Sequence, residues 1–205
     1  MLNVENLQCV RGDNCLFKAL NFSLRDGELL HLKGANGSGK TTLLRALSGL
    51  LMPVEGDISL DGKSLYKYRD EYHAQITYLG HLNGIKGELT TYENIQLHAD
   101  LNGFAIKQSE VDQALNELGL LSRADLPVKV LSQGQQKRVA LARLLVMDRR
   151  LWLLDEPFVA LDVGAVDWLQ RIIGKQLQKN AMVVLTTHQE VSIDANSKRE
   201  LVLGQ

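Results

Sequence analysis

Residues 34–41 decide the fold, and they read Gly34-Ala35-Asn36-Gly37-Ser38-Gly39-Lys40-Thr41. This stretch matches the spacing G-x-x-x-x-G-K-[ST], in which glycines allow backbone N–H groups to face the phosphates of a nucleotide. Lys40 would neutralise charge on the β- and γ-phosphates, and the Thr41 hydroxyl would bind Mg²⁺. Thr42 completes the predicted nucleotide-binding set. A predicted strand over 28–33 precedes the loop and a predicted helix over 40–51 follows it, which is the context that the motif requires.

On both sides of this loop the sequence predicts an α/β chain. Extended segments are expected over 2–10, 17–24, 57–60 and 75–79, and two apolar runs over 151–154 and 182–185 are typical of strands buried on both faces of a parallel sheet. From about 90 to 147 the pattern is helical, with a capping box of Thr90 and Glu93 and a second helix starting near Ser109. A further helix is expected over 166–179. We therefore expect one domain with a helical lobe inserted into an α/β core.

A pair of acidic residues follows the first of these apolar runs. Asp155 and Glu156 stand at the end of 151–154, where a parallel strand delivers its side chains to the nucleotide edge of the sheet. Asp155 is the predicted carboxylate of the Mg²⁺ shell, and Glu156 would polarise the attacking water as general base. The plain alternative is two acidic residues in a turn.

The segment 131–136, Leu131-Ser132-Gln133-Gly134-Gln135-Gln136, resembles the LSGGQ signature of ABC ATPases. On residue chemistry alone, Ser132 is also a good helix N-cap, so a plain helix start is the alternative. The resemblance implies that Ser132 and Gly134 bind the γ-phosphate of ATP held by a second copy of the chain. It therefore implies a nucleotide-sandwich dimer. Gln133 departs from the glycine that many family members have at this position.

The resemblance covers essentially the whole chain and implies its fold class. The expected fold is a P-loop NTPase, an ABC ATPase cassette with a RecA-like core, an antiparallel β subdomain and a helical subdomain at about 90–147. Residues 160–162, Ala-Leu-Asp, resemble the family's D-loop, and His188 resembles its switch histidine, which contacts the γ-phosphate. The implied activity is ATP hydrolysis with Mg²⁺.

Two positions depart from the family pattern. His81 stands where the family usually has the glutamine that links the nucleotide site to the membrane partner, and an imidazole could still bond water near Mg²⁺. His81 is therefore a candidate for both the nucleotide and the metal site, and we hypothesise that it makes coupling sensitive to pH. Where the family stacks an aromatic ring on adenine, the chain has Arg11, with Phe17 as the alternative.

Composition limits the partners. The 205 residues carry a formal net charge of −1, which argues against a nucleic-acid binder that works through bulk electrostatics. The start of the chain lacks the features of a secretory signal, and no apolar run is long enough to cross a bilayer. The two cysteines, Cys9 and Cys15, fit neither a metal knuckle nor a disulfide framework. Any membrane role is therefore expected to come through a partner.

Within the ABC ATPases the chain most resembles the ATP-binding proteins of cytochrome c maturation, the haem exporter ATPases, through 78–95, YLGHLNGIKGELTTYENI, and 131–144, LSQGQQKRVALARL. That resemblance implies a peripheral subunit on the cytoplasmic side of a bacterial inner membrane, bound to the integral membrane subunits of the maturation complex. It implies ATP-driven haem export or release of a haem-loaded chaperone, with no direct haem binding by this chain. Two alternatives are an ABC ATPase for another cargo and a soluble ABC ATPase of iron–sulfur assembly.

Overall fold

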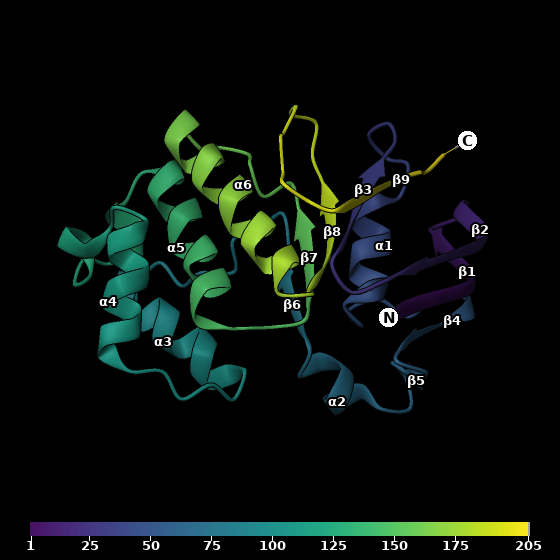
Figure 1. Cartoon of the computed structure of the whole chain (residues 1–205), viewed down its shortest axis with the longest axis horizontal. Coiled ribbons are helices and arrows are strands. Elements are labelled where there is room, and N and C mark those ends of the chain that lie inside the picture. The colour runs from purple at the N-terminus through teal and green to yellow at the C-terminus, as the bar shows by residue number, and fades with distance from the viewer. Residues whose placement is uncertain (205) are drawn as a thin grey trace. The chain divides into compact units, whose positions relative to one another are not determined.

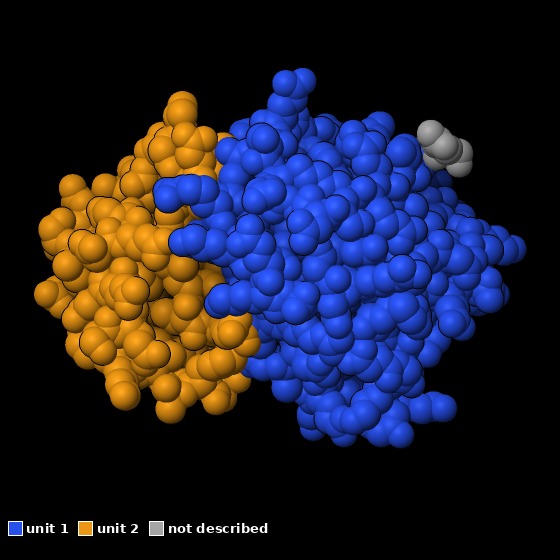
Figure 2. Space-filling model, viewed as in Figure 1, with its two compact units in different colours: residues 1–80, 149–157, 170–205 blue, residues 81–148, 158–169 orange. Residues whose placement is uncertain are grey.

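The computed structural model describes residues 1–204, which divide into two compact units. One unit comprises residues 1–80, 149–157 and 170–205, and the other comprises residues 81–148 and 158–169 (Figure 2). The helix α6, Val163–Gln178, starts in the second of these and ends in the first. We call them the sheet unit and the helical unit.

The sheet unit contains two β-sheets (Figure 1). An antiparallel sheet has the strand order β2-β1-β4-β5, and a parallel sheet has the order β6-β7-β8-β3-β9. The strands are β1 Leu2–Arg11, β2 Asn14–Leu24, β3 Glu28–Lys33, β4 Glu55–Leu60, β5 Lys63–Ser64, β6 Ile76–Leu79, β7 Leu151–Asp155, β8 Met182–Thr186 and β9 Ser197–Val202. The expected mixture of an antiparallel sheet and an α/β core is confirmed.

Apolar sequence explains the burial of two central strands of the parallel sheet. Every residue of β7 and of β8 is buried, as their uninterrupted apolar sequences predict. One core cluster joins Leu2, Val4 and Leu7 of β1 to leucines of β3 and of the helix α1, Lys40–Leu47. A short helix, α2 Arg69–His73, leads into β6. The core of this unit therefore surrounds the strand and the helix that carry the glycine-rich loop.

The helix α1 is shorter than the sequence predicted. It ends at Leu47, and Gly49 follows with φ +73°. The N–H of Gly49 donates to the carbonyl of Ala46 at 3.0 Å, and the N–H of Leu50 donates to that of Arg45 at 2.9 Å. These two bonds form a Schellman motif, so the glycine ends the helix before Pro53 can.

The helical unit is built from α3 Thr91–Leu101, α4 Gln108–Glu117 and α5 Gln133–Val146, which pack against one another. Short 3-10 turns cover Leu121–Arg123 and Val128–Val130. The capping box of Thr90 and Glu93 is present, as expected. The predicted start of the second helix at Ser109 was wrong, because the backbone N–H of Lys107 finds its acceptor in the Glu110 side chain and the helix begins at Gln108.

The sequence prediction missed α2, β5 and β9. Among residues 1–204 no helix combines the length and the apolar character needed to span a membrane.

Candidate functional site

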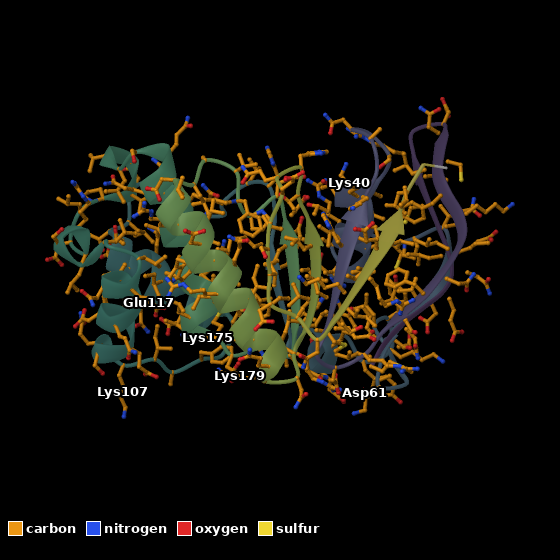
Figure 3. All side chains as sticks on the ribbon, turned by 45° about the horizontal axis from the view of Figure 1, so that its top comes forward. Lys40, Asp61, Lys107, Glu117, Lys175 and Lys179 are labelled. Atoms are coloured by element: carbon orange, nitrogen blue, oxygen red, sulfur yellow. The ribbon has the colours of Figure 1, made fainter. Side chains whose placement is uncertain are left out.

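The glycine-rich loop connects β3 to α1, and Lys40 is the first residue of that helix (Figure 3). The Lys40 ammonium donates hydrogen bonds to the carbonyl oxygens of Gly34 at 2.7 Å and Ala35 at 3.1 Å. These bonds hold the ammonium over the loop. The helix N-cap is Gly39, which has no side chain to cap the helix, so backbone N–H groups at the positive helix end are available to an anion.

Two glycines of this loop are required by close approach as well as by backbone angle. Gly34 has φ +143°, and a Cβ there would lie 2.5 Å from the Ser38 Oγ and 2.6 Å from the Leu203 carbonyl oxygen. Gly39 has φ +100°, and a Cβ there would lie 3.1 Å from the Phe17 ring. The loop therefore follows a path that residues with side chains would disrupt.

Asp155 and Glu156 lie at the end of β7. The Asp155 side chain is buried, and its Oδ1 accepts a hydrogen bond from the Thr186 hydroxyl at 2.9 Å. Burial raises the pKa of the neighbouring Tyr78, and the Asp155 carboxylate adds to this effect. Glu156 has φ +49°, in the left-handed region that few non-glycine residues adopt. Such a backbone angle is typical of residues whose surroundings hold them in place for function.

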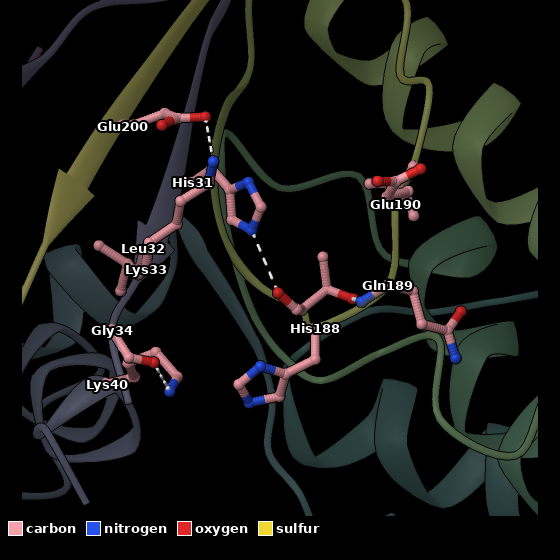
Figure 4. Close-up of a pocket in the computed structure, with 11 residues that line it drawn as sticks. His31, Leu32, Lys33, Gly34, Lys40, His188, Gln189, Glu190 and Glu200 are labelled. Carbon is pink, nitrogen blue, oxygen red and sulfur yellow. Dashed lines mark hydrogen bonds and ion pairs between the residues drawn. The ribbon is translucent and has the colours of Figure 1, made fainter. Parts of the chain in front are cut away.

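His188 faces Glu156. The His188 Nε2 lies 3.6 Å from the Glu156 Oε1, and the histidine side chain is 59% exposed while that of the glutamate is 16% exposed. His188, Lys40 and Gly34 also line one pocket of about 510 Å³ (Figure 4). The predicted phosphate lysine, base and switch histidine therefore converge in the sheet unit.

The remaining wall of the pocket comes from β3, β9 and the segment after β8. His31 Nε2 lies 3.3 Å from the Thr187 carbonyl oxygen, which links β3 to the segment that carries His188 (Figure 4). Lys33 pairs with Glu200 across β3 and β9. Sequence alone indicated no role for these side chains, because His31 meets Thr187 through the pairing of β3 with β8 and Lys33 meets Glu200 through the pairing of β3 with β9.

The residues at this site fit a Mg²⁺ ion. Asp155 Oδ2 is buried and has no hydrogen-bond partner among the described residues, so one carboxylate oxygen is available to a cation. Within residues 1–204 no group of three or more His, Cys, Asp and Glu side chains forms a metal cluster. Mg²⁺ needs no such cluster, because it binds one or two carboxylates and keeps waters or substrate phosphates as its other ligands.

Three predicted site residues lie in the helical unit: His81, Ser132 and Gly134. Ser132 is the N-cap of α5, with its Oγ accepting from the Gln135 N–H at 3.3 Å and its own N–H donating to the Gln135 Oε1 at 3.0 Å. The signature segment is therefore a helix N-terminus, with Gln133 as its first residue.

The signature glycine packs against the predicted D-loop. A Cβ on Gly134 would lie 3.0 Å from the Ala160 carbonyl oxygen, and Ala160 itself has φ +65°. Asp162 accepts a hydrogen bond from the Ala165 N–H at 2.9 Å at the start of α6, and its other oxygen pairs with Arg138 of α5. The signature and the D-loop are thus held together within the helical unit.

Of the two candidates for contact with the base, only Phe17 is brought to the glycine-rich loop. Its ring lies against Gly39. Arg11 is exposed at the end of β1, where it pairs with Asn14 of β2.

Thr186 is the site residue that the sequence analysis missed. Its hydroxyl donates to Asp155, and the Glu156 N–H donates to the same hydroxyl at 2.9 Å. A threonine at the end of an apolar strand was the available signal. Its meaning depended on knowing that Thr186 stands opposite Asp155 in the sheet.

Comparison with known proteins agrees with this geometry. The family described as ABC transporter matches residues 17–159. A cytochrome c biogenesis ATP-binding export protein CcmA from Dechloromonas aromatica is 54% identical over 204 residues, covering 100% of each chain. The protein of the same name from Nitrosomonas europaea is 48% identical and covers 100% of this chain and 96% of its own length.

A solved structure shares the fold. The dimeric post-hydrolysis state of the ATP-binding cassette MJ0796, bound to ADP and Pi, has a TM-score of 0.81 at 25% identity and covers 92% of this chain and 88% of its own.

Proposed function

Because this chain belongs to the ABC transporter family, as an ATP-binding subunit with ATPase activity, we propose that it hydrolyses ATP to drive the handling of haem in cytochrome c biogenesis. In that role ATP hydrolysis drives haem export or release of a haem-loaded chaperone, and the chain itself does not bind haem. Identity of 54% over the full length of a CcmA protein supports the assignment to cytochrome c biogenesis. The observation that carries the chemistry is the approach of His188 to Glu156 beside the pocket that contains Lys40.

In the proposed site, residues 34–42 bind the phosphates through backbone N–H groups, the Lys40 ammonium and the hydroxyls of Thr41 and Thr42. Lys40 exchanges its bonds to Gly34 and Ala35 for the β- and γ-phosphates. Thr41 and Asp155 would hold Mg²⁺, and His81 would bond to water near the ion. Bound Mg²⁺ would neutralise charge on the phosphate oxygens.

Glu156 is the proposed general base. Its carboxylate takes a proton from the water that attacks the γ-phosphate, and His188 contacts that phosphate and holds the glutamate in line. Glu156 adopts its left-handed backbone directly after the last residue of β7. Of the two candidates for stacking on adenine, Phe17 is favoured over Arg11, because its ring lies against Gly39 of the loop.

The proposed active form is a dimer. Ser132 and Gly134 of one copy present the α5 N-terminus to the γ-phosphate bound by the other copy. The related cassette MJ0796 is dimeric with ADP and Pi, which supports this arrangement. We further propose that residues 1–205 act as a single nucleotide-binding domain with its helical subdomain at about 90–147.

The proposed location is the cytoplasmic side of the bacterial inner membrane, where the chain would bind integral membrane subunits of the maturation complex. No partnership with nucleic acid is proposed. The relatives' designation as export proteins supports the membrane association.

The chemistry is tested with Glu156→Gln. The amide cannot accept the proton, so kcat should fall about 10²- to 10⁴-fold while ATP binding persists. Light scattering after gel filtration with ATP should show the trapped dimer. Glu55→Gln removes an exposed carboxylate at the start of β4 and should leave turnover unchanged. Normal turnover in Glu156→Gln would show that Glu156 is not the general base.

The biological role is tested by purifying tagged Glu156→Gln chain from detergent-solubilised membranes with Mg·ATP. Mass spectrometry should recover integral membrane subunits of cytochrome c maturation and the haem chaperone. Recovery of a different permease would retain the ATPase and refute the cytochrome c role.

A further inference from the structure

Thr186 occupies a special place in the parallel sheet. It is the last residue of β8, it is fully buried, and it stands opposite Asp155 of β7 in the strand register. Because β7 and β8 are parallel, both strands end at the same edge of the sheet. Thr186 therefore lies at the edge that carries the two acidic residues.

The hydroxyl of Thr186 makes two hydrogen bonds. It donates its proton to Asp155 Oδ1, and it accepts a hydrogen bond from the Glu156 N–H, each at 2.9 Å. The first bond joins a neutral donor to a buried carboxylate, which makes it stronger than a bond between neutral groups. The same side chain therefore restrains two consecutive residues with different proposed roles.

On Asp155, the bond fixes the direction of the carboxylate. With Oδ1 held by Thr186, the buried Oδ2 has no other hydrogen-bond partner among the described residues. A carboxylate that is free to rotate would divide its time between orientations. The hydroxyl selects the one that leaves Oδ2 for a cation.

On Glu156, the bond restrains the backbone. Glu156 adopts φ +49°, a conformation that persists in a residue with a side chain only when the surroundings hold it. Its N–H is bound by Thr186 Oγ1. Loss of that acceptor would let the peptide relax and move the Glu156 carboxylate away from His188.

We propose that Thr186 is a positioning residue that sets both the metal-facing oxygen of Asp155 and the backbone of Glu156. The proposal rests on the assignment of Asp155 and Glu156 above. Thr186 acts through these two residues, and it is the hydroxyl that acts, since valine would fill the same space without making either bond.

Two pairs of side chains at position 186 separate the effect of the hydroxyl from the effect of side-chain shape. Threonine and valine differ in the hydroxyl at nearly constant shape, and serine and alanine differ in it without the methyl group. The matched control is Thr77→Val in β6 of the same sheet, because the buried Thr77 hydroxyl has no hydrogen-bond partner in the described part of the chain. Thr77→Val therefore changes the same atoms with no bond lost.

Metal binding gives a readout that is independent of turnover. Mn²⁺ serves as the probe, and its affinity for the purified chain with bound ADP is measured by electron paramagnetic resonance. Thr186→Val should weaken Mn²⁺ binding about 10- to 100-fold, as loss of an outer hydrogen bond to a metal ligand does. Thr77→Val should bind Mn²⁺ as the unaltered chain does.

Turnover should separate positioning from nucleotide binding. Thr186→Val should lower kcat about 10- to 100-fold while the Kd for ATP without metal changes by less than about 3-fold. Thr186→Ser should restore both Mn²⁺ affinity and kcat to within about 5-fold of the unaltered chain, whereas Thr186→Ala should not. If the valine variant fails to fold, the serine and alanine variants decide the question.

Wild-type Mn²⁺ affinity and kcat in Thr186→Val would overturn the proposal, as would equal behaviour of the serine and alanine variants. These outcomes differ from failure of the proposed function. In that case Glu156→Gln would turn over normally, whatever Thr186 does to Mn²⁺ binding.

Discussion

At the scale of single residues, the candidate phosphate-binding side chains could be named from the sequence because their motif is local. Lys40, Asp155 and Glu156 were named from local patterns and His188 from the resemblance to ABC ATPases, and the structure places all four in one unit. Thr186 could not be placed in this way. Its role arises from a register that joins residues 31 positions apart.

Gly34 gives a test of the loop at this scale. Gly34→Ala would place a Cβ against Ser38 Oγ and the Leu203 carbonyl at a φ of +143°. The loop should shift, so the affinity for ATP should fall about tenfold or more, as measured by fluorescent nucleotide titration.

The control for Gly34 is Gly12→Ala. Gly12 also has a positive φ, +59°, but a Cβ there meets nothing within 4 Å. It should cost about 1 kcal/mol of stability and leave ATP affinity unchanged. Equal ATP affinities in the two variants would contradict the steric argument.

His98 gives a test of pH dependence. Burial lowers the pKa of His98 from its ordinary 6.5, and the positive charge of Arg143 lowers it further, while its hydrogen bond with the Gly84 carbonyl opposes the shift. Lys86 adds a small downward effect.

Because the unfolded chain takes up this proton before the folded one, the free energy of unfolding should decrease as pH falls below 6.5. Urea titrations between pH 5 and 7.5 measure this slope, and it should be shallower in His98→Gln. An unchanged slope in that variant would assign the pH dependence to other groups.

At the scale of elements, sequence predicted the type of each long element better than its ends. The strand β3 was placed at its observed bounds, whereas α1 ended early because Gly49 formed a Schellman motif that the more distant Pro53 had obscured. The strand β9 was missed. Its sequence contains Lys198, Arg199 and Glu200 in succession, so hydrophobic periodicity could not reveal an edge strand.

A charged cluster joins the ends of several elements in the sheet unit. Arg150, just before β7, donates two hydrogen bonds of 2.8 Å to the Asp26 carboxylate, and it also pairs with Asp61. The N-terminal amine of Met1 lies 2.6 Å from Asp61. These contacts lower the pKa of Asp61 from 3.8 to about 2, with the Arg150 hydrogen bond as the largest cause.

Arg150→Met should lower the free energy of unfolding at pH 7 by about 1 kcal/mol, because the pairs are partly exposed and form a network. Arg150→Lys should recover only part of this loss, since an ammonium cannot make the paired bonds. Thermal unfolding at low and at 0.5 M salt measures both effects, and the difference from the unaltered chain should shrink with salt. A loss that is independent of salt would point to packing instead.

The same cluster predicts that the folded chain loses stability at low pH. A depressed folded pKa means that the contribution of Asp61 is present above about 3.8 and is lost as pH falls toward about 2. Asp61→Asn should remove this part of the acid transition, as followed by circular dichroism. If Asp61→Asn unfolded in acid at the same midpoint pH as the unaltered chain, the prediction would be wrong.

At the scale of the whole molecule, the ABC fold was implied by the resemblance of several motifs, in their order along the chain, to those of ABC ATPases. The lengths of the inserted helices and the pairing of β9 did not, because they depend on contacts between distant segments. The predicted helical region at about 90–147 matched only part of the helical unit, which comprises residues 81–148 and 158–169.

Nucleotide binding should stabilise the whole folded chain. At an ATP concentration 100 times its Kd, the gain is about 2.7 kcal/mol, which corresponds to a rise in Tm of about 5–10 °C for a chain of this size. Differential scanning fluorimetry measures it. Lys40→Ala should abolish most of the shift, and an undiminished shift would place the nucleotide elsewhere.

The position of β3 between β8 and β9 has a consequence for synthesis. During synthesis on the ribosome, residues 28–33 and the glycine-rich loop emerge early. The strand partners of Leu29, which are Val183 on one side and Lys198 on the other, are synthesised much later. Until then the apolar strand has two open edges, which invite pairing with other nascent chains. A chain stalled before β8 would thus carry a finished nucleotide motif on an unsupported strand, so chaperone demand should be greatest late in translation.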